Sequence, residues 1–251
     1  MQVQTLGNFQ VGREGVLLTS KDWGRDKAVQ LFQFLMMVRH RKALHKEQII
    51  DRLWPDDDPD TVEQTFKVAL HGINKALEPQ RKSHSEAHFI TRVGLTYQLN
   101  TAHLWIDAEA LETLITIGNQ TLVDNPSMAK TAFREALSLY KGMYLPDRLY
   151  EDWAADERER LQVLTLGAYI TLAELVLTEN QMESIQLCQQ ALLIDAAWED
   201  AYRIQMEAYL LKGNRPMAIK TYQQCQKVLD EEMGIQPLPE TKKVYRKVID
   251  A

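Results

Sequence analysis

The sequence has few cysteines and no long apolar segment. Its 251 residues include two cysteines, Cys188 and Cys225, and both fall within helical patterns. Two cysteines cannot build the disulfide framework of a small secreted protein, so we expect a reducing compartment. The longest uncharged run, Leu161 to Ala173, is shorter than the roughly 20 apolar residues that cross a bilayer. The first residues also lack the basic and apolar regions of a signal peptide. We therefore expect a cytoplasmic protein that does not enter a membrane.

Motifs for catalysis and for metal binding are also lacking. The sequence has no glycine-rich phosphate-binding motif, and no serine, cysteine or carboxylate has a recognisable catalytic partner. His84 and His88 have the spacing of metal ligands, but they fall in a polar segment without cysteines. Asp56, Asp58 and Asp60 alternate as in a calcium loop, yet the required glycine and the distant glutamate are missing. We predict that the chain is not an enzyme and holds no cofactor and no metal.

The overall net charge of −6 is distributed unevenly along the chain. Residues 1–100 contain 14 Lys and Arg against 12 Asp and Glu, a net charge of +2, whereas the remaining residues carry −8. A content of 45% hydrophobic and 25% charged residues, at this length, predicts two globular domains. The charge difference indicates that these two parts of the chain face different partners.

The first sixty residues change from a strand pattern to a helix pattern. Short alternating segments, Val3 to Leu6, Phe9 to Val11 and Val16 to Leu18, are separated by glycines and predict a small antiparallel sheet. The apolar period then changes to that of a helix, which predicts helices over Asp26 to Arg39 and Lys46 to Trp54.

The most informative segment is a third predicted helix, Thr61 to Leu77. Asp58, Pro59 and Asp60 suit its first turn, and Glu63 stands where it would complete a capping box with Asp60. Its apolar stripe is formed by Val62, Phe66, Ala69, Leu70, Ile73 and Leu77. Its other face carries Gln64, Lys67, Val68, His71, Asn74 and Lys75. One interpretation of this second face is a solvated surface, and the other is a surface that binds DNA.

A hairpin after this helix favours the second interpretation. The segment His88 to Leu99 has the pattern of two short strands joined at Gly94. A helix followed by a hairpin is the arrangement of a winged helix-turn-helix. Residues 1–100 are therefore predicted to form a winged helix-turn-helix DNA-binding domain.

From Asp107 onward the pattern is almost entirely helical. Shifting Leu175 to Gln190 by 34 residues places it on Tyr209 to Gln224 with several matches, and 34 residues is the tetratricopeptide period. The pattern predicts an earlier helix pair over residues 108–124 and 127–141, a connection over residues 142–152 and a last helix over residues 239–249. The predicted fold class is mainly α with a small β component, with a tetratricopeptide-like array over residues 104–251.

Several strings in this order resemble the SARP-type bacterial transcriptional activators, which join an OmpR/PhoB-type winged helix to a bacterial transcriptional activator domain. In the first part the strings are Leu6–Phe9, Lys27–Leu35, Lys46–Pro55, Phe66–Pro79 and Phe89–Ile90. In the second part they are Ile106–Asp107, Trp153–Leu161 and Glu231–Pro237. The resemblance covers almost the whole chain. Similar pairs of domains also form the C-terminal regions of regulators like MalT.

The resemblance implies a sequence-specific regulator of transcription, most simply an activator. The residues that it places against double-stranded DNA are Gln64, Lys67, Val68, His71, Asn74 and Lys75 on the third helix, and Arg92 and Tyr97 in the wing. One departure concerns charge, since Asn74 and Lys75 stand where relatives commonly carry two basic residues, and Gly72 and Asn74 make this helix a poorer phosphate binder than the resemblance implies. A lost arginine costs about 1 to 3 kcal/mol of base discrimination.

Further partners follow from the resemblance. The acidic loop with Asp56, Asp57 and Asp58 would contact RNA polymerase, since an acidic loop suits a basic surface. The helical array would hold a second copy of the chain or a protein ligand. The alternative function is a protein-interaction scaffold whose winged helix no longer binds DNA.

Overall fold

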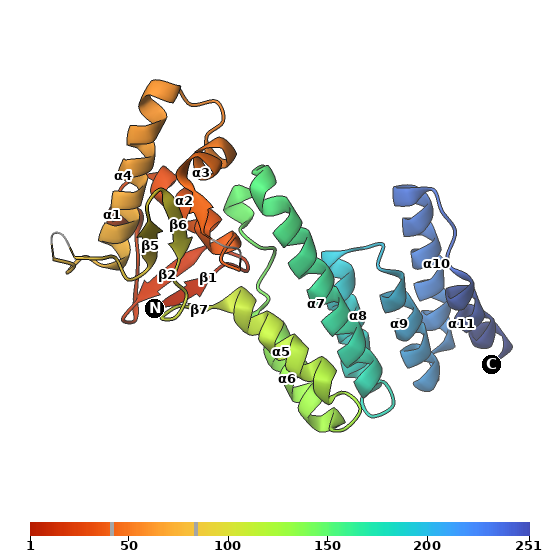
Figure 1. The fold of residues 1–251 in the computed structure, drawn as a ribbon. Helices are drawn as coiled ribbons and strands as arrows, with labels where there is room; N and C mark the ends of the chain where they lie inside the picture. Colours follow the sequence, from red (N-terminus) through yellow and green to blue (C-terminus); the bar gives the residue numbers. More distant parts are fainter. Residues whose placement is uncertain (41–42, 83–84) are drawn as a thin grey trace. The chain divides into compact units, whose positions relative to one another are not determined.

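The computed structural model describes residues 1–40, 43–82 and 85–251. Two compact units make up the fold (Figure 1). The N-terminal unit contains Met1–Ala110 together with Lys141–Arg160, and the C-terminal unit contains Leu111–Tyr140 together with Leu161–Ala251. The boundaries of these units differ from the division into residues 1–100 and 104–251 that the sequence predicts. The reason is that the segment Lys141–Arg160 returns to pack with the first 110 residues.

The N-terminal unit combines two small sheets with helices. Its elements are β1 (Gln2–Gln4), β2 (Gln10–Arg13), β3 (Val16–Leu17), α1 (Ser20–Trp23), α2 (Asp26–Met37), β4 (Leu44–His45), α3 (Lys46–Leu53), α4 (Pro59–Leu77), β5 (Ile90–Val93), β6 (Thr96–Leu99) and β7 (Trp105–Ile106). Two 3-10 turns, η1 (Pro146–Arg148) and η2 (Asp152–Ala154), follow in the returning segment.

The strand orders are β3-β2-β1-β7 in one sheet and β4-β6-β5 in the other. The expected antiparallel pairing of β1, β2 and β3 is confirmed. In addition, β7 pairs in parallel with β1, and β4 pairs with β6 as a third strand beside the hairpin. Each of these extra strands has two residues, which is too short for an alternating pattern to be recognised.

Helix α4 begins two residues earlier than expected because Asp58 is its N-cap. The Asp58 side chain accepts a hydrogen bond from the Asp60 N–H, and Pro59 occupies the first helical position. The expected capping box with Glu63 is wrong, since the position three residues after the cap is Thr61 and Glu63 pairs with lysines instead. The apolar stripe is buried as expected through Val62, Phe66, Ala69, Ile73 and Leu77.

Gly72 allows α4 to approach α1 and α2 closely. A Cβ atom at this position would lie 2.9 Å from the Cβ of Ala28 and 2.9 Å from the carbonyl oxygen of Trp23. The glycine therefore lies against the inner elements of the unit, and a side chain there would not be directed at a ligand. The packing at this position therefore requires glycine, and a basic residue would not fit there.

A buried carboxylate joins the first strand to the start of α5 (Asp107–Thr121). Asp107 is 2% exposed and accepts hydrogen bonds from the backbone N–H groups of Thr5 and Leu6 at 2.8 and 2.9 Å. It also accepts one from the Thr5 hydroxyl at 2.6 Å. These bonds satisfy the charge inside the unit and fix the chain where the winged helix ends.

The remaining helices form hairpins in the manner of tetratricopeptide repeats. They are α6 (Pro126–Leu139), α7 (Ala155–Val176), α8 (Gln181–Ile194), α9 (Glu199–Leu211), α10 (Arg215–Met233) and α11 (Pro239–Asp250). In Figure 1 they follow one another as adjacent antiparallel helices. No helix in the described part of the chain is long and apolar enough to cross a bilayer.

Asparagine caps mark the repeat. Asn125, Asn180 and Asn214 are the N-caps of α6, α8 and α10, and each side chain accepts a hydrogen bond from the N–H three residues later. The starts of α8 and α10, Gln181 and Arg215, are 34 residues apart, which is the expected period. Helix α11 completes the array by packing Val244 and Val248 against residues of α9 and α10.

We predict that Gly72→Ala destabilises the N-terminal unit by about 1 to 3 kcal/mol, because the new methyl group overlaps Ala28 and the Trp23 carbonyl. Denaturant unfolding followed by tryptophan fluorescence measures this change. The matched variant is Gly167→Ala in α7, where a Cβ meets no atom within 4 Å. It should stabilise by about 0.5 to 1 kcal/mol, because alanine favours a helix interior more than glycine does. Equal effects of the two substitutions would contradict the packing role of Gly72.

Candidate nucleic-acid interface

A groove lies between α4 and the β5–β6 hairpin, which run beside each other in the N-terminal unit (Figure 1). Its volume is about 230 Å³. The lining residues are Lys46, Glu63, Phe66, Lys67, Leu70, His71, Asn74, Arg92, Leu95 and Tyr97. The structure thus brings together five of the residues that the sequence assigned to DNA: Lys67, His71, Asn74, Arg92 and Tyr97.

The other three assigned residues lie on α4. Gln64 and Lys75 are exposed, and Val68 is partly exposed. Asn74 is half-buried, and its side-chain Oδ1 has no hydrogen-bond partner among the described residues. The polar face predicted for this helix is therefore available on the surface of the unit, while the Asn74 amide lies at the bottom of that face.

Tyr97 lies in the wing hairpin as expected, in β6, but its side chain is buried. It is 5% exposed, and its ring packs edge-on against Phe66 with 5.0 Å between the ring centroids. The Arg92 guanidinium lies 5.7 Å from the Tyr97 ring, as in a cation–π contact. Tyr97 is therefore placed to hold the hairpin against α4 and to support Arg92, and it offers little surface of its own to a ligand.

The hairpin ends in a tight turn with an exposed tip. Gly94 has a φ of 62°, which glycine adopts without strain. The Arg92 Nε donates to the Gly94 carbonyl at 2.8 Å, and the Thr96 hydroxyl donates to the Val93 carbonyl at 2.8 Å. Val93 is 78% exposed at this tip. The turn therefore presents Arg92 and Val93 in a fixed conformation.

Lys46 is a basic residue of this groove that sequence reasoning missed. It is the first residue of α3, and its Nζ lies 2.9 Å from Glu63 Oε1. Lys67 lies 3.2 Å from the same oxygen. Hydrogen bonds from Lys46 and Lys67, and their positive charges, lower the pKa of Glu63 below its ordinary value. The groove thus holds two lysines around one carboxylate. Only the tertiary fold shows this, because Lys46 and Glu63 belong to different helices.

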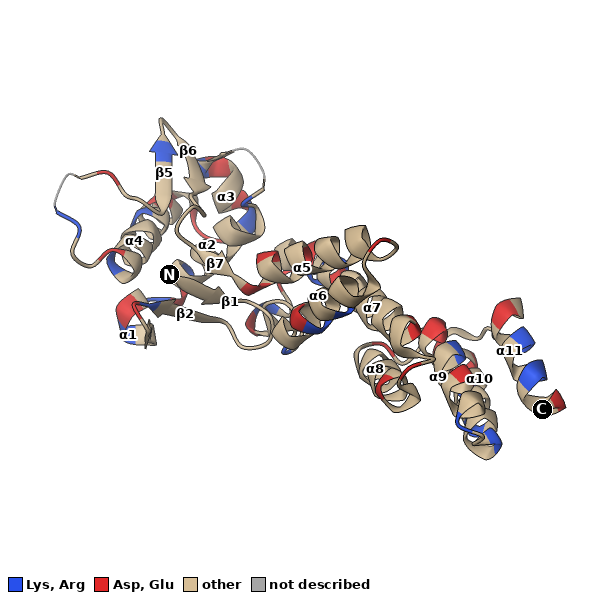
Figure 2. Cartoon of the chain, turned by 90° about the horizontal axis from the view of Figure 1, so that it is seen from below, with Lys and Arg blue, Asp and Glu red and all other residues tan. Residues whose placement is uncertain are grey.

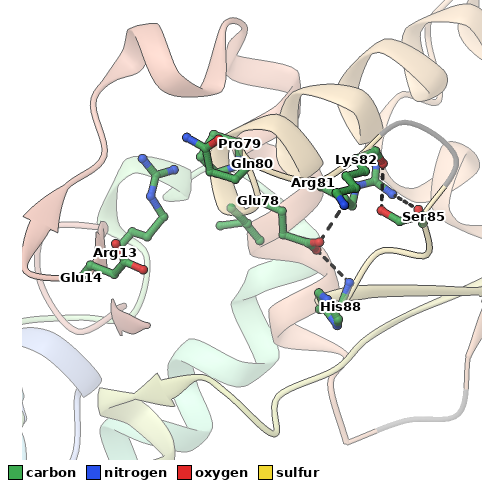
Figure 3. A pocket seen from close by; sticks show the side chains of 10 residues that line it. Arg13, Glu14, Glu78, Pro79, Gln80, Arg81, Lys82, Ser85 and His88 are labelled. Carbon is green, nitrogen blue, oxygen red and sulfur yellow. Dashed lines mark hydrogen bonds and ion pairs between the residues drawn. The ribbon is translucent and has the colours of Figure 1, made fainter.

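The carboxyl end of α4 is tied to the start of the hairpin (Figure 3). The Glu78 side chain accepts from the backbone N–H groups of His88 and Phe89 at 2.8 and 3.2 Å. Arg13 donates to the Ala76 carbonyl near the last turn of α4. Arg13, Glu78 and His88 border a pocket of about 520 Å³. The hydrogen bonds made by Glu78 and Arg13 set the direction in which the chain leaves α4 and enters β5.

Metal-binding side chains do not gather in the part of the chain that the structure describes. Of the two histidines with metal-like spacing, His88 borders the pocket beside Glu78, and His84 lies outside the described residues. Both cysteines are buried in helices, and desolvation raises the pKa of each thiol to about 12. Neither cysteine therefore has the character of a reactive thiolate.

The acidic loop between α3 and α4 contains three aspartates with different environments. Asp58 caps α4, Asp57 is paired with Lys27 of α2, and Asp56 is exposed. The Lys27 Nζ also lies 5.2 Å from the centroid of the Trp54 ring. The loop is therefore anchored at Trp54, Asp57 and Asp58. Figure 2 shows that acidic and basic residues both occur on the neighbouring α3 and α4.

These features define a winged helix-turn-helix joined to a helical array, and comparison with known proteins agrees. The family of the bacterial transcriptional activator domain matches residues 106–249. This is more than half of the chain, and the chain belongs to this family. The resemblance to SARP-type bacterial transcriptional activators is confirmed, and with it the class of transcription regulators.

A solved structure has the same fold over nearly the whole chain. It is Mycobacterium tuberculosis EmbR in complex with a low-affinity phosphopeptide, at a TM-score of 0.82 and 16% sequence identity. The match covers 99% of this chain and 65% of the EmbR chain, so this chain spans about two thirds of the length of that structure. No curated protein matches the sequence.

We predict that Lys46→Met raises the pKa of Glu63 toward its ordinary value, and that Lys67→Met raises it less, because Lys46 makes the larger contribution. Carbon-detected NMR titration of the side-chain carboxylates measures both shifts. Lys75→Met is the control, since Lys46 and Lys67 are the lysines that bond Glu63. Because the pKa is lowered in the folded state, these ion pairs stabilise the unit above the ordinary carboxyl pKa and are lost on acidification. A Glu63 pKa that none of the three variants changes would contradict the arrangement.

Proposed function

We propose that this regulator binds double-stranded DNA with α4 in the major groove and the β5–β6 hairpin beside it as a wing. The observation that carries the proposal is the groove in which Lys46, Lys67, His71 and Arg92 come together. An α-helix fits the width of the major groove, and exposed polar side chains on its outer face reach base edges. The burial of the opposite stripe of α4 supports this orientation.

The exposed residues of α4 divide into two roles. Lys67 and Lys75 are suited to phosphates, which need only a positive charge and supply most of the non-specific affinity. Gln64 and His71 are suited to base edges, and Asn74 would pair with adenine once its amide turns outward. Val68 would contact a thymine methyl group. Arg92 in the wing would contact the sugar-phosphate backbone or the minor groove, with Tyr97 supporting it.

Glu63 moderates this interface. Its carboxylate lies within 3.2 Å of the Nζ atoms of Lys46 and Lys67, so part of their charge is already neutralised in the free protein. Phosphates must compete with Glu63 for these lysines. We therefore expect weak non-specific binding, with affinity gained mainly on sites that His71 and Gln64 recognise.

The acidic loop between α3 and α4 supports contact with RNA polymerase. Asp56 is exposed, and the loop is held in place through Asp57 and Asp58, so a partner with a basic surface meets a preformed negative patch. The activating role of this chain would then combine DNA binding by α4 with polymerase binding by the loop.

The helical array supports a protein ligand or a second copy of the chain. Residues 101–251 carry the negative charge of the chain, and apolar side chains such as Leu193, at 79% exposed, and Leu211, at 57% exposed, lie on its surface. Stacked helical hairpins commonly use such surfaces to bind peptides or other chains.

We predict that Lys67→Ala combined with Lys75→Ala weakens DNA binding and flattens its salt dependence. Each lost phosphate contact lowers the slope of log K against log salt concentration by about 0.9. Fluorescence-anisotropy titrations of a labelled duplex at several salt concentrations measure both quantities. Lys212→Ala with Lys220→Ala makes the same charge change in the array and should leave binding unchanged.

Two results of this titration would count against α4 as the DNA-binding helix. One is unchanged binding by the α4 variant, and the other is an equal loss in the array variant. If the unmodified chain also shows no salt-dependent retention on DNA at low ionic strength, the scaffold alternative, with a winged helix that holds protein instead, is favoured.

We predict that Asp56→Asn with Asp57→Asn abolishes transcription activation while leaving DNA affinity unchanged, because the loop contacts polymerase and α4 contacts DNA. In-vitro transcription from a promoter that the protein binds, with parallel anisotropy titrations, measures the two effects. Glu240→Gln with Asp250→Asn removes two exposed acidic charges from α11 and serves as the control. Parallel loss of DNA binding and activation in the loop variant would contradict the division of roles.

A further inference from the structure

Helix α2 holds the returning segment through a set of polar contacts. We call residues Asp147–Glu151 the 147–151 turn. The Arg148 guanidinium donates to both carboxylate oxygens of Asp26 at 2.9 and 2.6 Å. Its Nε donates to Gln33 Oε1 at 2.7 Å, and Gln33 Nε2 donates to Asp147 at 2.8 Å. Bidentate and charge-assisted bonds of this kind fix geometry as well as distance. The turn is therefore firmly placed on α2.

One side chain of α2 links this turn to the acidic loop. Gln30 is 7% exposed, and its Nε2 donates to Glu151 Oε1 at 3.0 Å. Its Oε1 accepts from the Trp54 Nε1 at 2.7 Å, and Trp54 is the first residue after α3. Lys27, one helical turn before Gln30, pairs with Asp57 of the same loop. The 147–151 turn and the α3–α4 loop are thus bound to neighbouring positions of a single helix.

Two apolar side chains of the turn are exposed between these anchors. Leu149 is 47% exposed, and Tyr150 is 95% exposed. Their backbone is also held by Arg158, which donates to the Arg148 carbonyl at 2.8 Å and to the Leu149 carbonyl at 3.5 Å. A nearly fully exposed tyrosine contributes little to folding. On a rigid backbone, however, it costs little entropy to bind, and tyrosine is enriched among the residues that dominate protein interfaces.

The turn that carries Tyr150 and the α3–α4 loop that Gln30 joins to it are both rich in acidic residues. Asp56 and Asp57 lie in the loop, and Asp147, Glu151 and Asp152 flank the tyrosine in the chain. Of the cations near this surface, Lys27 and Arg148 are paired with Asp57 and Asp26, and Arg158 donates to the backbone carbonyls of the turn. A partner that fits this surface therefore presents basic side chains around an apolar depression that receives an aromatic ring.

We propose that the α3–α4 loop and the 147–151 turn form one composite surface that binds a basic patch of RNA polymerase, with Tyr150 as its aromatic anchor. The inference rests on the proposed function of the loop and extends it to the activator-domain segment. Gln30 joins the two parts by sharing its amide between Trp54 and Glu151. The activator domain would then take part in activation through its segment Lys141–Arg160, which packs with the winged helix.

The test compares Tyr150→Ala with Tyr150→Phe and Val123→Ala in the full chain. Val123 is 86% exposed in the C-terminal unit and is the matched control. Binding to purified bacterial RNA polymerase holoenzyme is measured by biolayer interferometry, and DNA affinity, thermal unfolding and oligomeric state are measured in parallel.

We expect Tyr150→Ala to weaken polymerase binding about tenfold or more. Tyr150→Phe should stay within about threefold of the unmodified chain, since the ring supplies most of the contact. Val123→Ala should bind polymerase as the unmodified chain does. DNA affinity and thermal unfolding should be unchanged in all three variants.

The outcomes separate this inference from the proposed function. If the Asp56 and Asp57 variant loses polymerase binding but Tyr150→Ala does not, the composite surface is overturned and the role of the loop stands. If neither variant loses binding, both fail. A change in oligomeric state, by light scattering, or in DNA affinity on Tyr150→Ala would assign the tyrosine to a second copy of the chain or to DNA, and would also overturn the inference.

Discussion

The close contact of α4 with α1 and α2 is the constraint on which the rest of the N-terminal unit depends. Gly72 leaves room for this contact, with Ala28 and the Trp23 carbonyl where a side chain would be. Because the apolar stripe of α4 is fixed inward, its polar face is fixed outward, and Phe66 offers Tyr97 a surface on which the hairpin packs. The groove between helix and hairpin is a consequence of this packing.

Helix α2 also holds other parts of the N-terminal unit in place, through its polar residues. Its polar residues Asp26, Lys27, Gln30 and Gln33 bind both the acidic loop and the returning segment. Gln30 and Gln33 are buried, so each would carry a desolvation cost of about 1 to 3 kcal/mol if its amide were left without a partner, and this makes their contacts specific in geometry. The unit therefore includes a segment that belongs, by family, to the activator domain.

The sequence predicted the elements whose signals are local. Periodic apolar residues indicate α2, α3 and α4, and the 34-residue repeat indicates α8 and α10, whose starts are marked by asparagine caps. Interactions between distant residues were not predictable in this way. The short strands β4 and β7 pair over long separations, Lys46 meets Glu63 across two helices, and Lys141–Arg160 packs with the first unit. The resemblance places Tyr97 in the wing and marks Gly72 as a loss for phosphate binding, whereas packing determines the roles of both residues.

The proposed DNA-binding surface consists of α4 and the hairpin. It can be tested by chemical-shift mapping of the isotope-labelled chain, titrated with a duplex selected from a random pool. We expect the largest amide shifts on the exposed residues of α4 and on β5 and β6, and little change in the helices α8 to α11. Shifts concentrated in those array helices, or no shifts on a duplex that the chain was selected to bind, would contradict it.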